Sequence, residues 1–241
     1  MENSLPVALS RQDALWRQMD MIATNLANAN TAGYKADRMI FSEFVDRTSP
    51  KDPPLSLVHD MTFLRDMSEG PISDTGNPLD LAISGDGFFT VQTAKGPRYT
   101  RHGAFQLNNQ GQITTLSGNP LLGAGGAPIQ VPQGTETITI TRDGTVSADG
   151  STIGQIQLVS FASPQALVKE GNDLYDAKKQ RPAPPANAEI HQGSIEGSNV
   201  QGVVEMTRMI NVVRNYQAAN RLVETEHRRI LDAIDGIVGK A

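Results

Sequence analysis

Apolar residues recur at alternating three- and four-residue steps at both ends of this chain, and this pattern constrains the fold more than any other feature. Near the N-terminus the repeating positions are Leu5, Ala8, Gln12, Leu15, Met19, Ile22, Leu26 and Ala29. Near the C-terminus they are Met206, Met209, Val213, Tyr216, Asn220, Val223, His227, Ile230, Ile234 and Ile237. A narrow stripe of this period packs best against another helix, and its repeat predicts left-handed supercoiling. The sequence therefore predicts a long helix at each end, the two pairing as a coiled-coil-like layer.

Two helices alone cannot bury both stripes, because a two-helix layer leaves apolar surface facing water. Three polar residues inside the stripes, Gln12, Asn220 and His227, weaken a simple two-helix zipper and are suited to specifying register. We therefore expect other subunits to complete the packing. The predicted subunit-interface residues are Leu15, Met19, Ile22, Asn25, Leu26, Asn28, Met206, Met209, Val213, Tyr216, Asn220, Val223, His227, Ile230, Ile234 and Ile237.

The middle of the chain, from about Pro78 to Tyr175, changes to short runs of β-forming residues separated by glycine. Runs such as GFFTVQT, TITIT and IGQIQLVSF predict strands, and NNQG, RDG and ADG predict turns because Asn, Asp and Gly tolerate positive φ. Proline-rich stretches flank this region and predict extended connectors, since consecutive prolines disfavour helix. The predicted fold class is α+β, with long N- and C-terminal helices pairing as a coiled-coil-like layer and a central all-β domain joined by extended linkers.

This pattern predicts five segments along the chain. They are an N-terminal helix at 1–35, an extended linker at 36–75, a β-rich outer domain at 76–180, an extended linker at 181–196 and a C-terminal helix at 197–241.

Composition excludes several classes of protein. The formal net charge is -5 and the isoelectric point is near 5.4, so the sequence has no basic footprint for nucleic acid or an anionic membrane. No cysteine is present, which excludes disulfides, thiol catalysis and thiolate metal sites. No cleaved secretory signal and no membrane-spanning segment are expected, because the start lacks a basic region followed by an apolar run and no apolar stretch approaches about 20 residues. We predict neither nucleic-acid binding nor membrane insertion.

Motifs for catalysis are weak. Asp80 and Asp86, in the stretch NPLDLAISGDGFF, are candidates for the acid-base pair of a cell-wall glycan hydrolase. The stretch is explained more simply by a strand, on which Leu79, Leu81 and Ile83 alternate, and a Gly-Asp-Gly turn into a second strand. None of the four histidines has metal-ligand spacing, and the glycine-rich GAGGAP lacks the lysine of a phosphate-binding loop. We therefore predict no enzyme and no catalytic, cofactor-binding or metal-binding residues.

The segment NLANANTAGYK, residues 25–35, ends the first helix in asparagines, although asparagine is a poor helix former. Short amides at a helix end can bind backbone groups that have no intrahelical partner, and Gly33 favours the end of the helix there. Whether the partners of these amides belong to the same chain or to a neighbour stays open. At the other end of the chain, EGSNV offers Ser198 or Asn199 as the N-cap of the second helix.

Three motifs together carry a resemblance to a known family. NLANANTAGYK, EGSNVQGVVEMTRMI and TGNPLDLAISGDGFF with YTRHGAFQLNNQGQI resemble the axial proteins of the bacterial flagellum, the rod and hook subunits. The resemblance covers nearly the whole chain in the family's order. The start of the chain, the entry to the β region and the modest length are most similar to the proximal rod proteins. The family often has Asn-Asn-Leu-Ala-Asn where this chain has Thr24 first, and threonine keeps the hydrogen-bonding capacity.

The resemblance implies a structural subunit without catalytic residues. Its terminal helices would form an inner tube, and its β domain would lie outside. The implied partners are copies of itself, other proximal and distal rod subunits and, during secretion, the flagellar type III export apparatus. The implied location is the basal-body rod in the periplasm, after export without a cleaved signal. A distal rod subunit and a periplasmic cell-wall hydrolase are the alternatives.

Overall fold

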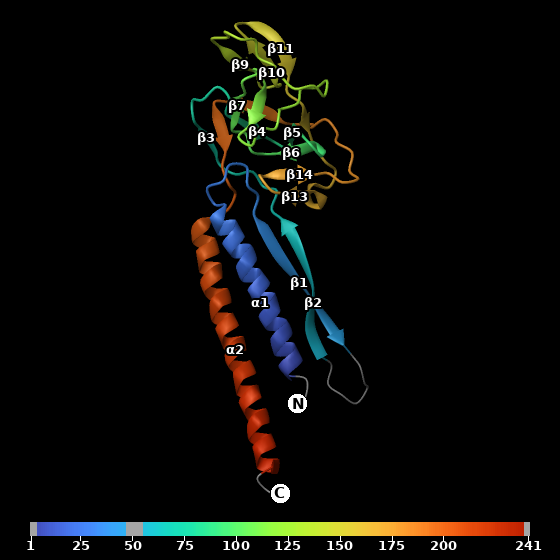
Figure 1. The fold of residues 1–241 in the computed structure, drawn as a ribbon, viewed down its shortest axis with the longest axis vertical. Helices are drawn as coiled ribbons and strands as arrows, with labels where there is room; N and C mark the ends of the chain where they lie inside the picture. The colour runs from blue at the N-terminus through green and yellow to red at the C-terminus, as the bar shows by residue number, and fades with distance from the viewer. Residues whose placement is uncertain (1–3, 47–54, 239–241) are drawn as a thin grey trace. The chain divides into compact units, whose positions relative to one another are not determined.

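The computed structural model describes residues 4–46 and 55–238 (Figure 1). Two compact units are present among them. The helical unit comprises the described parts of residues 1–27, 37–65 and 201–241, and the β unit comprises residues 28–36 and 66–200. Among the described residues, no helix combines the length and apolar character that crossing a membrane requires.

The helical unit contains two helices and one hairpin. Its elements are α1 (Ser4–Ala27), β1 (Asp37–Asp46), β2 (Leu55–Arg65) and α2 (Gly202–Val238). The helices are antiparallel: Gln12 Nε2 donates hydrogen bonds to Tyr216 Oη at 3.1 Å and to Asn220 Oδ1 at 3.3 Å, while Leu26 lies beside Gly202. Because α2 has 37 residues and α1 has 24, the C-terminal part of α2 extends beyond the start of α1 by roughly 20 Å.

The coiled-coil-like layer predicted from the stripes is wrong. A small apolar cluster joins the helices, with Leu15 and Ile22 of α1 packed against Val212 and Ala219 of α2. Two members of the predicted C-terminal stripe, Met209 and Tyr216, pack against this cluster. At two other positions the buried residue precedes the predicted one: Val212 and Ala219 are buried, whereas the stripe predicted Val213 and Asn220.

The physical reason lies in side-chain size and in a third packing partner. Small residues such as Ala219 allow the helix backbones to approach closely, whereas the larger Met206 is 52% exposed. In addition, α1 lies between α2 and the β1–β2 hairpin (Figure 1). Helix α1 therefore packs on two sides, against a helix and against strands, and a two-helix seam does not describe the unit.

The extended linkers of the predicted fold class are also wrong. Within the first, residues 37–46 and 55–65 form an antiparallel hairpin whose register shifts between Ser42 and Glu43. Within the second, β15 (Glu189–Gln192) and β16 (Ser194–Glu196) pair with strands of the β unit. Both segments hold β-forming residues such as MIFSEFV and EIHQ, which outweigh the nearby prolines. Pro50, Pro53 and Pro54 lie outside the described residues.

The β unit consists of short antiparallel strands. They are β3 (Ile72–Asp74), β4 (Leu81–Ser84), β5 (Phe88–Thr93), β6 (Gly96–Thr100), β7 (Phe105–Leu107), β8 (Ile113–Thr115), β9 (Ile138–Ile140), β10 (Thr145–Ala148), β11 (Ser151–Gln155), β12 (Leu158–Val159), β13 (Val168–Glu170), β14 (Leu174–Asp176), β15 and β16, with a short 3-10 helix η1 (Pro164–Ala166). The largest sheet has the strand order β12-β5-β6-β14-β13, and β11-β10-β9 form a second sheet.

Two apolar cores fill the β unit. Alternation along β5 separates them: Phe89 and Val91 belong to one core, and Phe88 belongs to the other. The larger core also collects Leu81, Ile83 and residues from the second sheet. The smaller core is aromatic, and Phe88 makes edge-on ring contacts at 5.8 Å with both Phe161 and Tyr175. The prediction of a β-rich middle agrees with this architecture.

Candidate functional site

A buried ion cluster of Lys35, Arg101 and Glu196 lies in the β unit and is called the Glu196 cluster below. Lys35 Nζ lies 2.6 Å from Glu196 Oε1, and Arg101 Nη1 lies 2.9 Å from Glu196 Oε2. The side chains of Lys35 and Glu196 are 0% exposed and that of Arg101 is 3% exposed. The cluster therefore holds two cations and one anion away from water.

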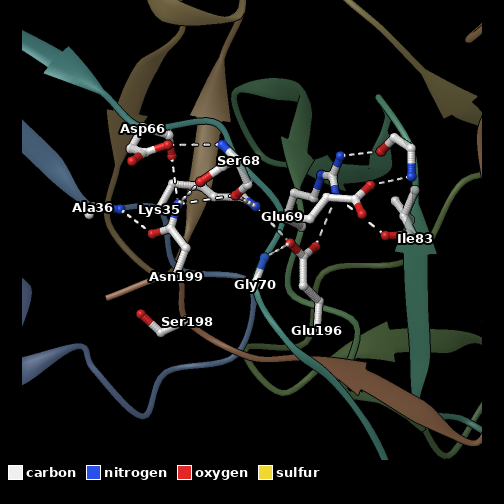
Figure 2. A network of polar contacts seen from close by, with 12 residues as sticks. Lys35, Ala36, Asp66, Ser68, Glu69, Gly70, Ile83, Glu196, Ser198 and Asn199 are labelled. Carbon is white, nitrogen blue, oxygen red and sulfur yellow. Dashed lines mark hydrogen bonds and ion pairs between the residues drawn. The ribbon is translucent and has the colours of Figure 1, made fainter. Parts of the chain in front are cut away.

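Backbone groups add hydrogen bonds to these charges (Figure 2). Lys35 Nζ donates to the Ser68 carbonyl at 2.6 Å, and the Gly70 N–H donates to Glu196 Oε1 at 3.0 Å. Arg101 also donates to the Ile83 carbonyl at 3.3 Å. Because buried charges are tolerated only when they are paired and hydrogen-bonded, this coordination explains how the cluster persists.

The chain reaches the cluster through a close backbone approach at Gly33. Gly33 has φ of +67°, and a Cβ at this position would lie 2.5 Å from the carbonyl carbon of Arg101. Its N–H donates to the Glu196 carbonyl at 2.8 Å. Only glycine combines this conformation with this proximity, so the Ala32-Gly33 step brings Lys35 to Glu196.

Electrostatics favour the charged form of the glutamate. Burial by itself raises the pKa of Glu196, but the attraction of Arg101 and Lys35 outweighs burial, and the pKa lies below its usual value. Burial lowers the pKa of Lys35 below its usual value, and the contact with Glu196 opposes this shift only in part. The carboxylate therefore stays ionised between its two cationic partners at neutral pH.

Asn199 joins three segments beside the cluster (Figure 2). Its Oδ1 accepts a hydrogen bond from the Ala36 N–H at 2.8 Å, and its Nδ2 donates to the Asp66 carbonyl at 2.8 Å and the Ser68 carbonyl at 3.1 Å. The predicted role of Ser198 or Asn199 as an N-cap is wrong, because α2 begins at Gly202. Asn199 instead ties together the segments at which the chain enters and leaves the β unit.

Asn25 has a comparable role inside the helical unit. This residue is buried near the end of α1, its Nδ2 donates to the Asp37 carbonyl at 2.8 Å and its Oδ1 accepts from the Asp37 N–H at 3.0 Å. The side-chain amide thus bonds both the N–H and the carbonyl of one residue, as a neighbouring strand would, and holds the start of β1 against α1. Asn28, in the turn after α1, accepts a hydrogen bond from the Thr31 hydroxyl at 3.2 Å. Asp37 and Thr31, which bond to these two amides, belong to the same chain.

The predicted interface residues divide by exposure within the helical unit. Leu15, Ile22 and Asn25 are buried, whereas Met206 is exposed and Ile230 is 42% exposed. The half-buried members are Met19, Leu26, Met209, Val213, Tyr216, Asn220 and Val223. Asn28 is half-buried and His227 is exposed, and the side chains of Ile234 and Ile237 lie outside the described residues. Whether these residues contact a second subunit stays a prediction.

The two carboxylates considered as catalytic residues of a hydrolase, Asp80 and Asp86, lie in places that a structural role explains. Asp80 is buried, and its two oxygens accept hydrogen bonds from the Thr75 hydroxyl at 2.7 Å and the Asn77 amide at 3.0 Å. Asp86 is exposed in the turn between β4 and β5. Among the described residues, no group of three or more histidine, aspartate or glutamate side chains is placed to hold a metal ion.

Three sequence families match separate parts of this chain. Residues 5–35 match the family described as flagella basal body rod protein, and residues 191–235 match the C-terminal family of flagellar basal body rod FlgEFG proteins. Residues 82–148 match the D1 domain of the flagellar hook protein FlgE/F/G. Each match contributes one member of the Glu196 cluster: Lys35, Glu196 and Arg101 respectively.

Curated relatives extend over nearly the whole chain. The chain is 39% identical over 228 residues to the flagellar basal-body rod protein FlgF of Caulobacter vibrioides, covering 93% of each chain. It is 38% identical to FlgF of Mesorhizobium japonicum, covering 90% of each, and 31% identical to the rod protein FlgG of Bacillus subtilis, covering 98% of this chain and 99% of that one. The class of protein is thus a flagellar axial subunit. The chain belongs to the flagellar basal-body rod proteins, and within them to the FlgF type.

Sequence reasoning missed the members of the Glu196 cluster as site residues. Lys35, Arg101 and Glu196 all lie inside the motifs that carried the family resemblance, but each reads alone as an ordinary surface charge. The available signal was their position within two residues of Gly33, Gly103 and Gly197, glycines at which another backbone segment approaches closely. Without the fold, nothing in the sequence pairs charges that are 161 positions apart, as Lys35 and Glu196 are.

Proposed function

We propose that this structural rod subunit polymerises through its terminal helices into the proximal part of the flagellar drive shaft, which carries motor torque toward the hook and filament. The observation that carries the proposal is the unfinished packing of α2. Large apolar side chains remain exposed along it, among them Met206, Ile210, Leu222 and Leu231. Exposed apolar residues repeated along one helix favour burial against further subunits.

The Glu196 cluster supports a role in carrying load. Lys35, Ser68 and Asn199 belong to the segments that lead out of the β unit toward β1, β2 and α2, and hydrogen bonds join these segments to one another. A force that reaches the β unit through one segment is therefore shared by the others. A dense, buried and ion-paired cluster suits a joint that must keep its geometry under torque.

The proposed partners are copies of this chain and other rod subunits, with the flagellar type III export apparatus during secretion. The proposed location is the basal-body rod, in the periplasm, after export without cleavage of a signal. A distal position in the rod is the second candidate, because the similarity to FlgG of Bacillus subtilis spans nearly the full chain. Head-to-tail contacts that do not close into a ring generate a helical assembly of the kind that a rod requires.

Electron microscopy of purified basal bodies tests this proposal. Basal bodies from cells without this chain should contain a rod that stops within its proximal part, and expression of the chain should restore the rod. A complete proximal rod in the absence of the chain would refute the proximal assignment. A rod that stops only beyond the proximal part would favour the distal assignment.

A further inference from the structure

An open groove lies inside the helical unit, between α1 and the β1–β2 hairpin. It has a volume of about 360 Å³ and is lined by Asp13, Trp16, Arg17, Asp20, Met21, Thr24, Asn25, Asp37 and Phe63. The side chains on its apolar wall are unusually open to solvent: Trp16 is 59% exposed and Phe63 is 58% exposed. Trp16 is the only tryptophan of the chain. A large exposed indole and an exposed phenylalanine that line one groove favour a protein-binding surface.

The rim of this groove is acidic. Asp13 and Asp20 are seven residues apart on α1, so they lie on one face with a spacing of about 10.5 Å, and Trp16 lies between them. Asp13 pairs with Arg17 at 2.9 Å, but the carboxylate of Asp20 has no ion-pair partner in the part of the chain that the structure describes. The groove therefore has an apolar wall, and the unpaired negative charge of Asp20 lies beside it.

The outer face of α2 has the opposite charge at the same spacing. Arg214, Arg221 and Arg228 recur every seven residues and are exposed, and none forms an ion pair among the described residues. Arg214 and Arg221 each follow a buried contact residue of α2, Val212 or Ala219, by two positions, or about 200° around the helix. The arginines therefore point away from α1 of their own chain.

We infer that the Trp16 groove is the docking site for the arginine face of α2 from a second copy of this chain. This inference rests on the proposed function and names the contact by which the helical units assemble. Two carboxylates and three guanidinium groups share one heptad spacing, so the faces match in register as well as in charge. The exposed Ala218, between Arg214 and Arg221, leaves room for the Trp16 indole, and arginine stacks favourably on tryptophan.

The contact is heterologous, which fits a growing rod. The groove is lined by residues of α1 and of the β1–β2 hairpin, whereas the arginines of α2 point away from α1. Helix α1 lies between that hairpin and α2 (Figure 1). One copy can therefore use its groove on one neighbour and its arginines on another, so the contact propagates without closing. A symmetric contact of groove with groove would bring like charges together, and the acidic rims would oppose it.

Disulfide formation in assembled rods tests the contact. Because the chain has no native cysteine, any disulfide that forms within or between its copies must involve the introduced cysteines. Thr24→Cys lines the groove and Gln217→Cys lies between two of the arginines. The double variant should give a ladder of cross-linked multimers from purified basal bodies under mild oxidation. Each single variant should stay monomeric. A matched control combines Gln217→Cys with Arg11→Cys, which precedes Asp13 by two positions and so lies on the opposite face of α1; it should give no ladder.

The outcomes separate this inference from the proposed function. If the wild-type chain is absent from purified basal bodies, the proposed function fails. If the double variant enters the rod at the wild-type level but stays monomeric, or if Thr24→Cys alone gives dimers, the docking inference fails while the rod assignment stands. A cross-linked band that contains a different rod protein in place of a second copy would also overturn it.

Charge reversal gives an independent readout. Asp20→Arg should reduce incorporation into rods by about threefold, in line with the modest strength of exposed ion pairs. A second charge reversal is then added to the same chain, either Arg214→Asp or Arg221→Asp. One of the two double variants should recover most of the wild-type level of incorporation into rods. Restoration by neither combination would overturn the pairing of the two faces.

Discussion

Substitution of Glu196 by glutamine should destabilise the β unit strongly, although the two side chains have nearly the same shape. Among the described residues, Glu196 is the only anion that forms ion pairs with both Lys35 and Arg101, whose side chains are 0% and 3% exposed, and the change removes it. Breaking a buried ion pair from one side costs about 3–5 kcal/mol. Because burial already lowers the pKa of Lys35, that lysine can release its proton in the variant, which limits the penalty to about 3 kcal/mol.

Thermal unfolding followed by near-ultraviolet circular dichroism measures this loss. For a unit of this size, about 3 kcal/mol lowers Tm by about 10 °C. Three of the four tyrosines, Tyr34, Tyr99 and Tyr175, belong to the β unit, so tyrosine signals report mainly on that unit. Tyr216 and Trp16 belong to the helical unit. The matched control is Glu189→Gln: this glutamate is 56% exposed and lies 3.9 Å from Arg142, so its loss should change stability by less than about 0.5 kcal/mol.

The effect of Glu196→Gln should also depend on pH. The pKa of Glu196 is lower in the folded chain than in the unfolded chain, so its ionised form stabilises the fold above the unfolded pKa of about 4.3. That stabilisation is lost as pH falls through the lower pKa of the folded state. The stability difference between wild type and variant should therefore be full at neutral pH and narrow in acid. A variant whose Tm lies within about 2 °C of wild type at pH 7, or a difference that widens in acid, would refute this account of the cluster.

Three further substitutions test other parts of the structure. Asn25→Ala removes both hydrogen bonds to the Asp37 backbone and should cost about 2–3 kcal/mol, measured as faster hydrogen exchange in β1; unchanged exchange would contradict the bridging role. Gly33→Ala should destabilise the β unit by more than about 3 kcal/mol, well beyond Gly76→Ala, which has a similar φ of +74° but open space around it; equal Tm shifts would exclude the close backbone approach as the cause. Ile230→Asp should abolish incorporation into rods and leave the tyrosine circular dichroism of the β unit unchanged, because this side chain is already 42% exposed in the single chain; normal motility would rule out its place in the interface.

The sequence predicted the order and type of the secondary-structure elements more reliably than the contacts between them. The periodicity at both ends predicted α1 and α2, and the glycine-punctuated middle predicted the β-rich region, since both patterns are local. Two predictions, the extended linkers and the coiled-coil-like helix pair, were wrong because contacts between different segments of the chain decide both structures. The prolines near position 50 suggested a linker, but β1 and β2 pair with each other, and that pairing depends on residues that precede and follow the proline-rich stretch.

The interface stripe shows the same division. Met209 and Tyr216 pack against α1 as the periodicity predicted, because a repeat of alternating three and four steps specifies one face of a helix. Periodicity does not specify which of two adjacent positions, such as Val212 or Val213, faces the partner. The fit of small side chains between α1 and α2 decides that, and only the packed structure contains it.

By itself, the sequence determined the two helices, the β-rich middle, the absence of thiol chemistry and the membership of the rod family, because each depends on residue type and local order. The tertiary structure alone decided that Lys35, Arg101 and Glu196 meet. Each of the two cations would be costly to bury without Glu196 beside it, and the Glu196 carboxylate would be costly to bury without the two cations. Three motifs that are far apart in the chain therefore become one site only in the folded chain. The backbone turn at Gly33 and the position of β16 bring them together.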